Sequence, residues 1–216
     1  VIAIIPEVAV LVLFSASFIL VLFTFAYALS GRWYVALFAP VLYLVVYVFL
    51  WTEVSLNLFS IILAVLVSTL IGTSLNWRTA AVFAGLLTIM DVVQVFGTRF
   101  MVISAQKLIA LKLPVAVILP MFPSEGRIVL GLGDLFLAGI LAIQAMEKYG
   151  TRTGLVMVGL SAFVFVAEES MMLSFGIGFF PATIMVGGGW LVSLFAIESY
   201  NRSFKSLTMS RQREPR

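Results

Sequence analysis

The chain has 216 residues, of which 62% are apolar and 11% are charged, whereas soluble domains are about 45–50% apolar and about 25% charged. Its mean hydropathy of +1.17 excludes a soluble globular fold and indicates a polytopic membrane protein. The net charge is only +3, and the basic residues gather in connections and near the C-terminus. That distribution is typical of topology signals in membrane proteins rather than of a nucleic-acid surface.

Seven apolar stretches of nearly the length that crosses a bilayer, roughly 20 residues, follow one another along the chain. They cover residues 8–29, 33–51, 55–75, 79–98, 128–146, 154–173 and 180–198. The segment 99–126 carries three prolines, so we expect a helix extension followed by an irregular apolar loop. The sequence therefore predicts an all-α transmembrane bundle in one domain, residues 1–200, with a basic, disordered tail at 201–216.

The basic residues in the connections predict an orientation for these spans. With the tail inside, nine lysines and arginines lie on the inner side and four on the outer side. Because basic residues are enriched in cytoplasmic connections, we expect a cytoplasmic C-terminus and an external N-terminus.

Two residue types that carry much enzyme chemistry are missing, because the chain has no cysteine and no histidine. Their absence excludes disulfides, thiolate nucleophiles and zinc thiolate sites. It also excludes serine–histidine triads and histidine metal sites. Acid–base chemistry must therefore use carboxylates, with lysine and tyrosine as weaker candidates. We expect no cofactor and no metal.

Two aspartates lie inside predicted spans, Asp91 in the fourth and Asp134 in the fifth. An aspartate at the centre of a span costs about 2.5–3.5 kcal/mol on insertion scales, so each must face protein or water. A single buried aspartate serves helix packing as often as function, but two in consecutive spans favour a shared site. Neighbouring carboxyl groups share one proton, so that one activates water while the other polarises a carbonyl group.

Small residues and a proline accompany these aspartates. Gly131-Leu132-Gly133 precedes Asp134, where two glycines permit close approach of another backbone or simply helix packing. Pro181-Ala182-Thr183 opens the last span, a common position for proline. Gly187-Gly188-Gly189 is interpreted as a packing site. Glu168 and Glu169 are adjacent, so they point about 100° apart on a helix and cannot form one carboxylate pair.

In their order and spacing, these motifs resemble the presenilin and signal peptide peptidase family of intramembrane aspartyl proteases. The resemblance covers residues 79–199 and is closest to an archaeal presenilin homologue. The matching segments are Gly131-Leu132-Gly133-Asp134 for the family's GxGD motif, Met90-Asp91 for Tyr-Asp, Val95-Phe96-Gly97-Thr98 with Met101-Val102 as in signal peptide peptidases, and Pro181-Ala182-Thr183 for Pro-Ala-Leu.

The resemblance implies which residues form the site. It makes Asp91 and Asp134 the catalytic pair. It also implies substrate-binding residues, which are Gly131, Gly133, Pro181, Ala182 and Thr183. Met90 and Thr183 depart from the family's tyrosine and leucine. The family has nine spans against the seven visible here, so either the chain is contracted or segments are missing from this sequence.

The leading hypothesis is an aspartic endopeptidase that cleaves the transmembrane helices of substrate proteins within the lipid bilayer of an archaeal cell membrane. No nucleic-acid partner is expected, and a homo-oligomer is left open. One alternative is a small proton-coupled transporter that uses the same two aspartates, although the sequence has no internal repeat of the kind transporters show. The other alternative is a non-catalytic membrane scaffold.

Overall fold

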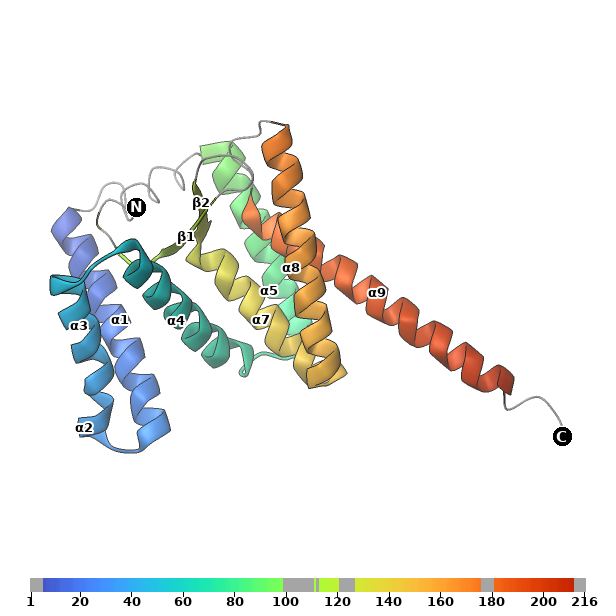
Figure 1. Ribbon diagram of the computed structural model, residues 1–216, viewed down its shortest axis with the longest axis horizontal. Coiled ribbons are helices and arrows are strands. Elements are labelled where there is room, and N and C mark those ends of the chain that lie inside the picture. Colours follow the sequence, from blue (N-terminus) through green and yellow to red (C-terminus); the bar gives the residue numbers. More distant parts are fainter. Residues whose placement is uncertain (1–5, 99–110, 112, 121–126, 176–180, 212–216) are drawn as a thin grey trace.

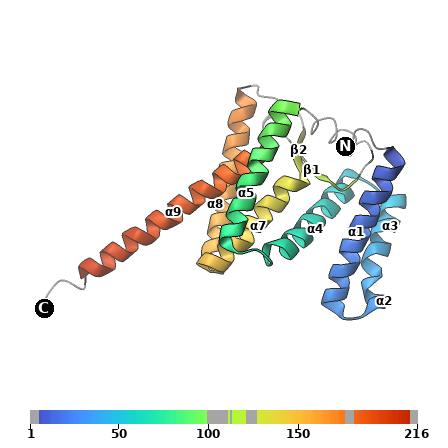
Figure 2. The same cartoon turned by 180° about the vertical axis from the view of Figure 1, so that it is seen from behind.

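The computed structural model describes residues 6–98, 111, 113–120, 127–175 and 181–211. These residues are mostly helical, with one small two-stranded sheet (Figures 1 and 2). The helices are α1 (Glu7–Ser30), α2 (Trp33–Ala36), α3 (Phe38–Phe49), α4 (Glu53–Gly72), α5 (Trp77–Val92), the π-helical η1 (Val93–Thr98), α7 (Leu132–Tyr149), α8 (Thr151–Ser174) and α9 (Ala182–Arg211). The strands are β1 (Ala116–Pro120) and β2 (Arg127–Gly131).

Five of the described helices are long and apolar enough to cross a membrane. They are α1, α4, α5 continued to Phe96, α8 to Met172 and the first part of α9 to Ser199. Large apolar side chains are exposed along them, as expected for surfaces that face lipid rather than water. The second predicted span, Trp33–Phe49, is a shorter apolar pair of helices. The helical bundle is therefore confirmed, and it is compatible with a membrane protein.

The all-α prediction needs one correction, in the segment before Asp134. Residues predicted as an irregular loop contain β1, and the first residues of the predicted fifth span form β2. The two strands pair antiparallel, with Ile118 opposite Val129 and Ala116 opposite Gly131. Short apolar runs rich in β-branched residues suit either a strand or a helix, so composition alone misplaced this boundary. Residues 99–110 and 121–126 of the predicted connection lie outside the described residues.

Helix α9 also differs from its predicted extent. The sequence predicts a disordered tail from Asn201, whereas α9 continues as a helix to Arg211. No glycine or proline occurs between Gly189 and Pro215, so no helix-breaking residue interrupts it. Its C-terminal part projects away from the other helices (Figures 1 and 2). The predicted break at Gly176–Gly178 and the start at Phe180 lie outside the described residues.

Helix α7 lies at the centre of the bundle and packs against α4, α5, α8, α9 and β2 (Figure 1). Its contact with α4 is close because Gly139 faces Ser68: a Cβ at Gly139 would lie 2.6 Å from the Ser68 Cβ. Further along, the buried Gln144 side chain donates to the carbonyl oxygen of Gly72 at 2.9 Å, near the end of α4. Small residues and a side-chain amide therefore hold α4 and α7 together, as is common between membrane helices.

An aromatic cluster joins the other face of α4 to α1 and α3. The Tyr43 ring is fully buried and meets Phe18 edge-on, with ring centroids 4.4 Å apart. It meets Phe59 of α4 in a similar way at 5.1 Å. Such edge-to-face pairs contribute about 0.5–1.5 kcal/mol beyond the burial of their area, so α1 and α3 form a side layer against α4.

The hairpin is anchored to α4 by side chains that take the place of a third strand. The Asn57 side chain accepts from the Ile118 N–H at 2.7 Å and donates to the Ile118 carbonyl oxygen at 2.8 Å. One turn later, the buried Ser60 hydroxyl donates to the Ala116 carbonyl oxygen at 2.9 Å. The outer edge of β1 is therefore satisfied by α4, while its inner edge pairs with β2.

Replacing Asn57 with leucine is expected to release the hairpin. The substitution leaves two backbone groups of Ile118 without partners, at roughly 1–3 kcal/mol for each buried group. Thermal unfolding in detergent should show a lower stability, and the Ile118 amide should exchange hydrogen faster. Thr69→Ala is the control, because the exposed Thr69 hydroxyl bonds only within α4, to Val65, and its loss should change stability by less than about 0.5 kcal/mol. Equal stability of Asn57→Leu and wild type would show that this anchor is not needed.

Candidate active site

The three segments that carry the predicted site residues meet at one end of the bundle. These are the C-terminal part of α5, the first turn of α7 and the first turn of α9, and all three lie beside the hairpin (Figure 1). Helices α5, α7 and α9 pack against one another pairwise. Asp91, Asp134 and Thr183, which are far apart in the sequence, therefore reach the same region.

Contacts at the opposite end of α5 and α7 set the two aspartates at the same depth. Trp77 at the start of α5 meets Tyr149 at the end of α7, with ring centroids 5.7 Å apart, and the Lys148 ammonium lies 3.8 Å above the Trp77 ring. Asp91 follows Trp77 by 14 residues and Asp134 precedes Tyr149 by 15 residues. At a rise of about 1.5 Å per residue, both aspartates lie about 21–23 Å along their helices from this end.

Asp91 is 8% exposed and is held from another helix. The Thr183 hydroxyl at the start of α9 donates to Asp91 Oδ2 at 2.7 Å, and this threonine is itself 7% exposed. The second carboxyl oxygen, Oδ1, is buried and has no hydrogen-bond partner among the described residues. In Asp91, therefore, Oδ2 is held by a hydrogen bond, and Oδ1 accepts none from the described residues.

Asp134 is 5% exposed and lies in the first turn of α7. Its carboxyl group accepts hydrogen bonds from the backbone N–H groups of Gly131 and of Asp134 itself. Because Gly131 is the residue that caps α7, this is the return half of a capping box. The carboxyl groups of Asp134 and Asp91 are also close enough to interact electrostatically. The two aspartates therefore form a buried acidic pair between α5 and α7.

The predicted substrate-binding residues surround this pair in different ways. Gly131 ends β2, and a Cβ there would lie 3.1 Å from Asp134 Oδ2, whereas a Cβ at Gly133 would meet nothing within 4 Å. Pro181 is buried directly before α9, and Ala182 beside it is half-buried. The resemblance places an apolar residue at Thr183, but here the hydroxyl binds Asp91. That substrate touches these residues stays a prediction.

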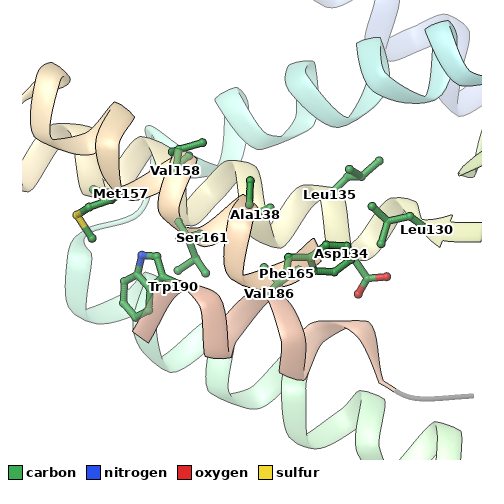
Figure 3. A pocket seen from close by; sticks show the side chains of 14 residues that line it. Leu130, Asp134, Leu135, Ala138, Met157, Val158, Ser161, Phe165, Val186 and Trp190 are labelled. Atoms are coloured by element: carbon green, nitrogen blue, oxygen red, sulfur yellow. The ribbon is translucent and has the colours of Figure 1, made fainter. Parts of the chain in front are cut away.

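An apolar pocket of about 200 Å³ begins at Asp134 and runs between α7, α8 and α9. Asp134 and Leu130 lie at one end of it, and Met157 and Trp190 lie at the other (Figure 3). Apart from Asp134 and Ser161, the lining consists of apolar and aromatic residues. The pocket therefore offers an apolar space beside one carboxyl group of the pair.

Two glycines of the predicted last span lie close to side chains or backbone of α8 in the described structure. Gly189 allows α8 to approach α9, because a Cβ there would lie 2.8 Å from the Ser161 carbonyl oxygen. Glu168 points toward Gly188, with Oε1 3.1 Å from the position of a Cβ. The packing interpretation of the three glycines thus fits the contact at Gly189. Among the described residues, no group of three or more acidic side chains is placed to hold a metal ion.

Sequence reasoning missed three polar residues that support the site, Asn57, Ser60 and Gln144. Each lies inside an apolar helix and was not distinguished from its neighbours by any motif. A polar side chain in the middle of a span is the one signal that would have found them, since such residues usually bond to another element.

Comparisons with protein-family models, with curated proteins and with solved structures find no match for this chain. The family resemblance in its motifs therefore remains a prediction from the sequence.

Gly131→Ala is expected to impair the peptide hydrolysis predicted from the sequence, whereas Gly133→Ala should not disturb the carboxyl pair. Gly131 has φ −66° and ψ 149°, which alanine adopts easily, so the new methyl group acts only by crowding Asp134. We expect a loss of roughly 10-fold or more in kcat for Gly131→Ala, since small misplacements of a reacting group are costly. Initial rates on a transmembrane peptide measure it, and equal rates for Gly131→Ala and wild type would contradict the contact.

Proposed function

We propose that this protein is a membrane-embedded aspartic endopeptidase that hydrolyses peptide bonds in apolar, membrane-spanning segments of other proteins. The observation that carries the proposal is the buried pair of Asp91 and Asp134, brought from two helices to one depth and close enough to interact. A carboxyl pair is the hydrolytic arrangement that needs neither histidine, cysteine nor metal. The chain contains no histidine and no cysteine.

The chemistry requires one proton on the pair. The ionised carboxylate accepts a proton from a water molecule, and the oxygen of that water attacks the peptide carbonyl carbon. The protonated carboxyl donates to the carbonyl oxygen, which becomes a hydroxyl in the tetrahedral intermediate. Collapse of the intermediate breaks the C–N bond and transfers a proton to the leaving amine. The products are a carboxylic acid and an amine, and the pair again holds one proton.

The hairpin supports an extended substrate beside the pair. A peptide in a helix satisfies its own backbone groups, so it must unwind before a carbonyl group can be attacked. Because α4 occupies the outer edge of β1, an added strand would have to pair with β2, whose last residue is Gly131. Such strand addition is a common way to hold an extended peptide. It would deliver the scissile bond directly to Asp134.

We further propose seven membrane crossings in an archaeal cell membrane, with α2–α3 and α7 crossing in addition to the five long apolar helices. Asp134, Glu147 and Lys148 give α7 more charge than an ordinary span, but α7 is central in the bundle and packs against α4, α5, α8 and α9. Polar residues at membrane depth are tolerated where protein surrounds them. Burial among the other helices thus allows α7 to carry three charged residues and still cross the membrane.

Asp91→Asn and Asp134→Asn are each expected to abolish hydrolysis. Both substitutions keep size and polarity but remove the shared proton, so each single variant should lose at least about three orders of magnitude in kcat. The double variant should lose little more, as for residues that act as one unit. Purified protein in detergent is incubated with a transmembrane peptide, and the products are identified by mass spectrometry.

Glu169→Gln is the matched control, since it neutralises a carboxyl group in apolar α8 outside the site, and it should cleave like wild type. Cleavage by either folded aspartate variant would exclude this mechanism. Proton-coupled flux in vesicles, without cleavage, would instead favour the transporter.

The apolar pocket beside Asp134 predicts a preference for a large apolar side chain next to the cleaved bond. Ala138→Phe places an aromatic ring among the lining residues (Figure 3). We expect kcat/KM for a peptide with phenylalanine at that position to fall roughly 10- to 200-fold, while a peptide with alanine there is cleaved as before. Leu155→Phe, at an exposed position of α8, is the control. An equal loss for both peptides with Ala138→Phe would show that the pocket does not select the side chain.

A further inference from the structure

Several threonine side chains inside the helices of this protein bond to their own helix, whereas serines such as Ser60 and Ser68 bond to other elements. The hydroxyls of Thr24, Thr69 and Thr88 each donate to the carbonyl oxygen four residues earlier, at 2.8, 2.7 and 2.9 Å. This is the usual arrangement for threonine within a helix, because the preceding turn always offers such a carbonyl group. These hydroxyls are therefore engaged locally and are not directed at another element.

Thr183 differs because of its place in the chain. It is the second residue of α9, which begins at Ala182, so the residue four positions earlier lies before the helix. Its hydroxyl instead crosses to α5 and donates to Asp91 Oδ2 at 2.7 Å, with both side chains buried. Pro181 is buried beside it, and the Ile184 N–H bonds to the Pro181 carbonyl oxygen at 3.1 Å. The first turn of α9 is therefore fixed around this contact.

We propose that Thr183 is a positioning residue for the acidic pair: its hydroxyl fixes Asp91 Oδ2 and thereby leaves Oδ1 as the oxygen of Asp91 that exchanges the proton during hydrolysis. This inference rests on the proposed function. Oδ2 already accepts one hydrogen bond, whereas Oδ1 has no partner among the described residues, so Oδ1 is the oxygen with its full acceptor capacity left for a proton or a water molecule.

The contact gives Thr183 a role that differs from the substrate contact implied by the motif resemblance. A residue that only binds substrate changes KM when it is replaced. A residue that fixes the orientation of a catalytic carboxyl group changes kcat, because substrate binding is left intact while the reacting oxygen loses its orientation. The two roles are therefore separable by steady-state kinetics.

Thr183→Val tests the inference, because valine keeps the branched shape and removes only the hydroxyl. We expect kcat for a transmembrane peptide to fall 10- to 100-fold with KM within 2-fold of wild type, as roughly found when a buried hydrogen bond to a charged group is lost. Thr183→Ser restores the hydroxyl and should recover most of kcat. Thr88→Val is the matched control, since Thr88 lies one turn before Asp91 but bonds to Ala84, and it should leave kcat within 2-fold.

A second measurement keeps the inference separate from the proposed function. Melting temperatures in detergent are compared for Thr183→Val, Asp91→Ala and the double variant. Because both single changes break the same hydrogen bond, the loss in the double variant should be smaller than the sum of the two. This cycle reports on the contact even if wild type cleaves no peptide, in which case the proposed function fails on its own.

The outcomes are decisive in both directions. A selective loss of kcat that serine restores, together with non-additive melting temperatures, supports the inference. A wild-type kcat in Thr183→Val overturns the inference. If KM rises while kcat is unchanged, Thr183 binds substrate instead, and the inference is also overturned. Equal losses in Thr183→Val and Thr183→Ser, or additive melting temperatures, also overturn it, because packing rather than the hydroxyl would then be responsible.

Discussion

Helix α7 cannot shift without displacing most of the molecule, because it packs against α4, α5, α8, α9 and β2. Its approach to α4 depends on the absence of a side chain at Gly139, opposite Ser68. Between apolar helices in lipid, burial of apolar surface supplies little attraction, so close packing and hydrogen bonds must hold the helices together. The position of Asp134, in the first turn of α7, is therefore determined by contacts along the whole helix.

Several polar side chains in this bundle form hydrogen bonds that connect different elements. Asn57 completes the edge of β1, Gln144 binds the end of α4, and Thr183 binds Asp91. In apolar surroundings an unpaired polar group costs several kcal/mol, so each of these contacts is strongly favoured over its alternatives. The bonds from α4 hold β1, β1 pairs with β2, and β2 ends at Gly131, whose N–H binds Asp134. Fold and candidate site thus share the same hydrogen bonds.

Asp134 combines two roles that are usually separate. As the third residue of α7 it accepts from the backbone N–H of Gly131, as a capping carboxylate does. Capping alone would explain an acidic residue in a first helical turn. It does not explain the burial of Asp91 at the same depth on α5, where a helix interior has no need of a carboxyl group. The pairing of two such residues, of which Asp91 caps no helix, is the strongest argument for chemistry here.

The sequence by itself determined that the chain folds mainly as long apolar helices. It also drew attention to Asp91 and Asp134, because burying an isolated carboxyl group is too costly to occur without a reason. It also indicated the close packing at Gly189. The sequence did not predict the hairpin, because a short apolar run fits a strand or a helix equally well. It also did not predict the hydrogen-bond partners of Asn57, Gln144 and Thr183. Which polar groups meet depends on how helices distant in the sequence cross, and only the tertiary structure decides that: Thr183 reaches Asp91 because α9 begins at the depth at which α5 carries its aspartate.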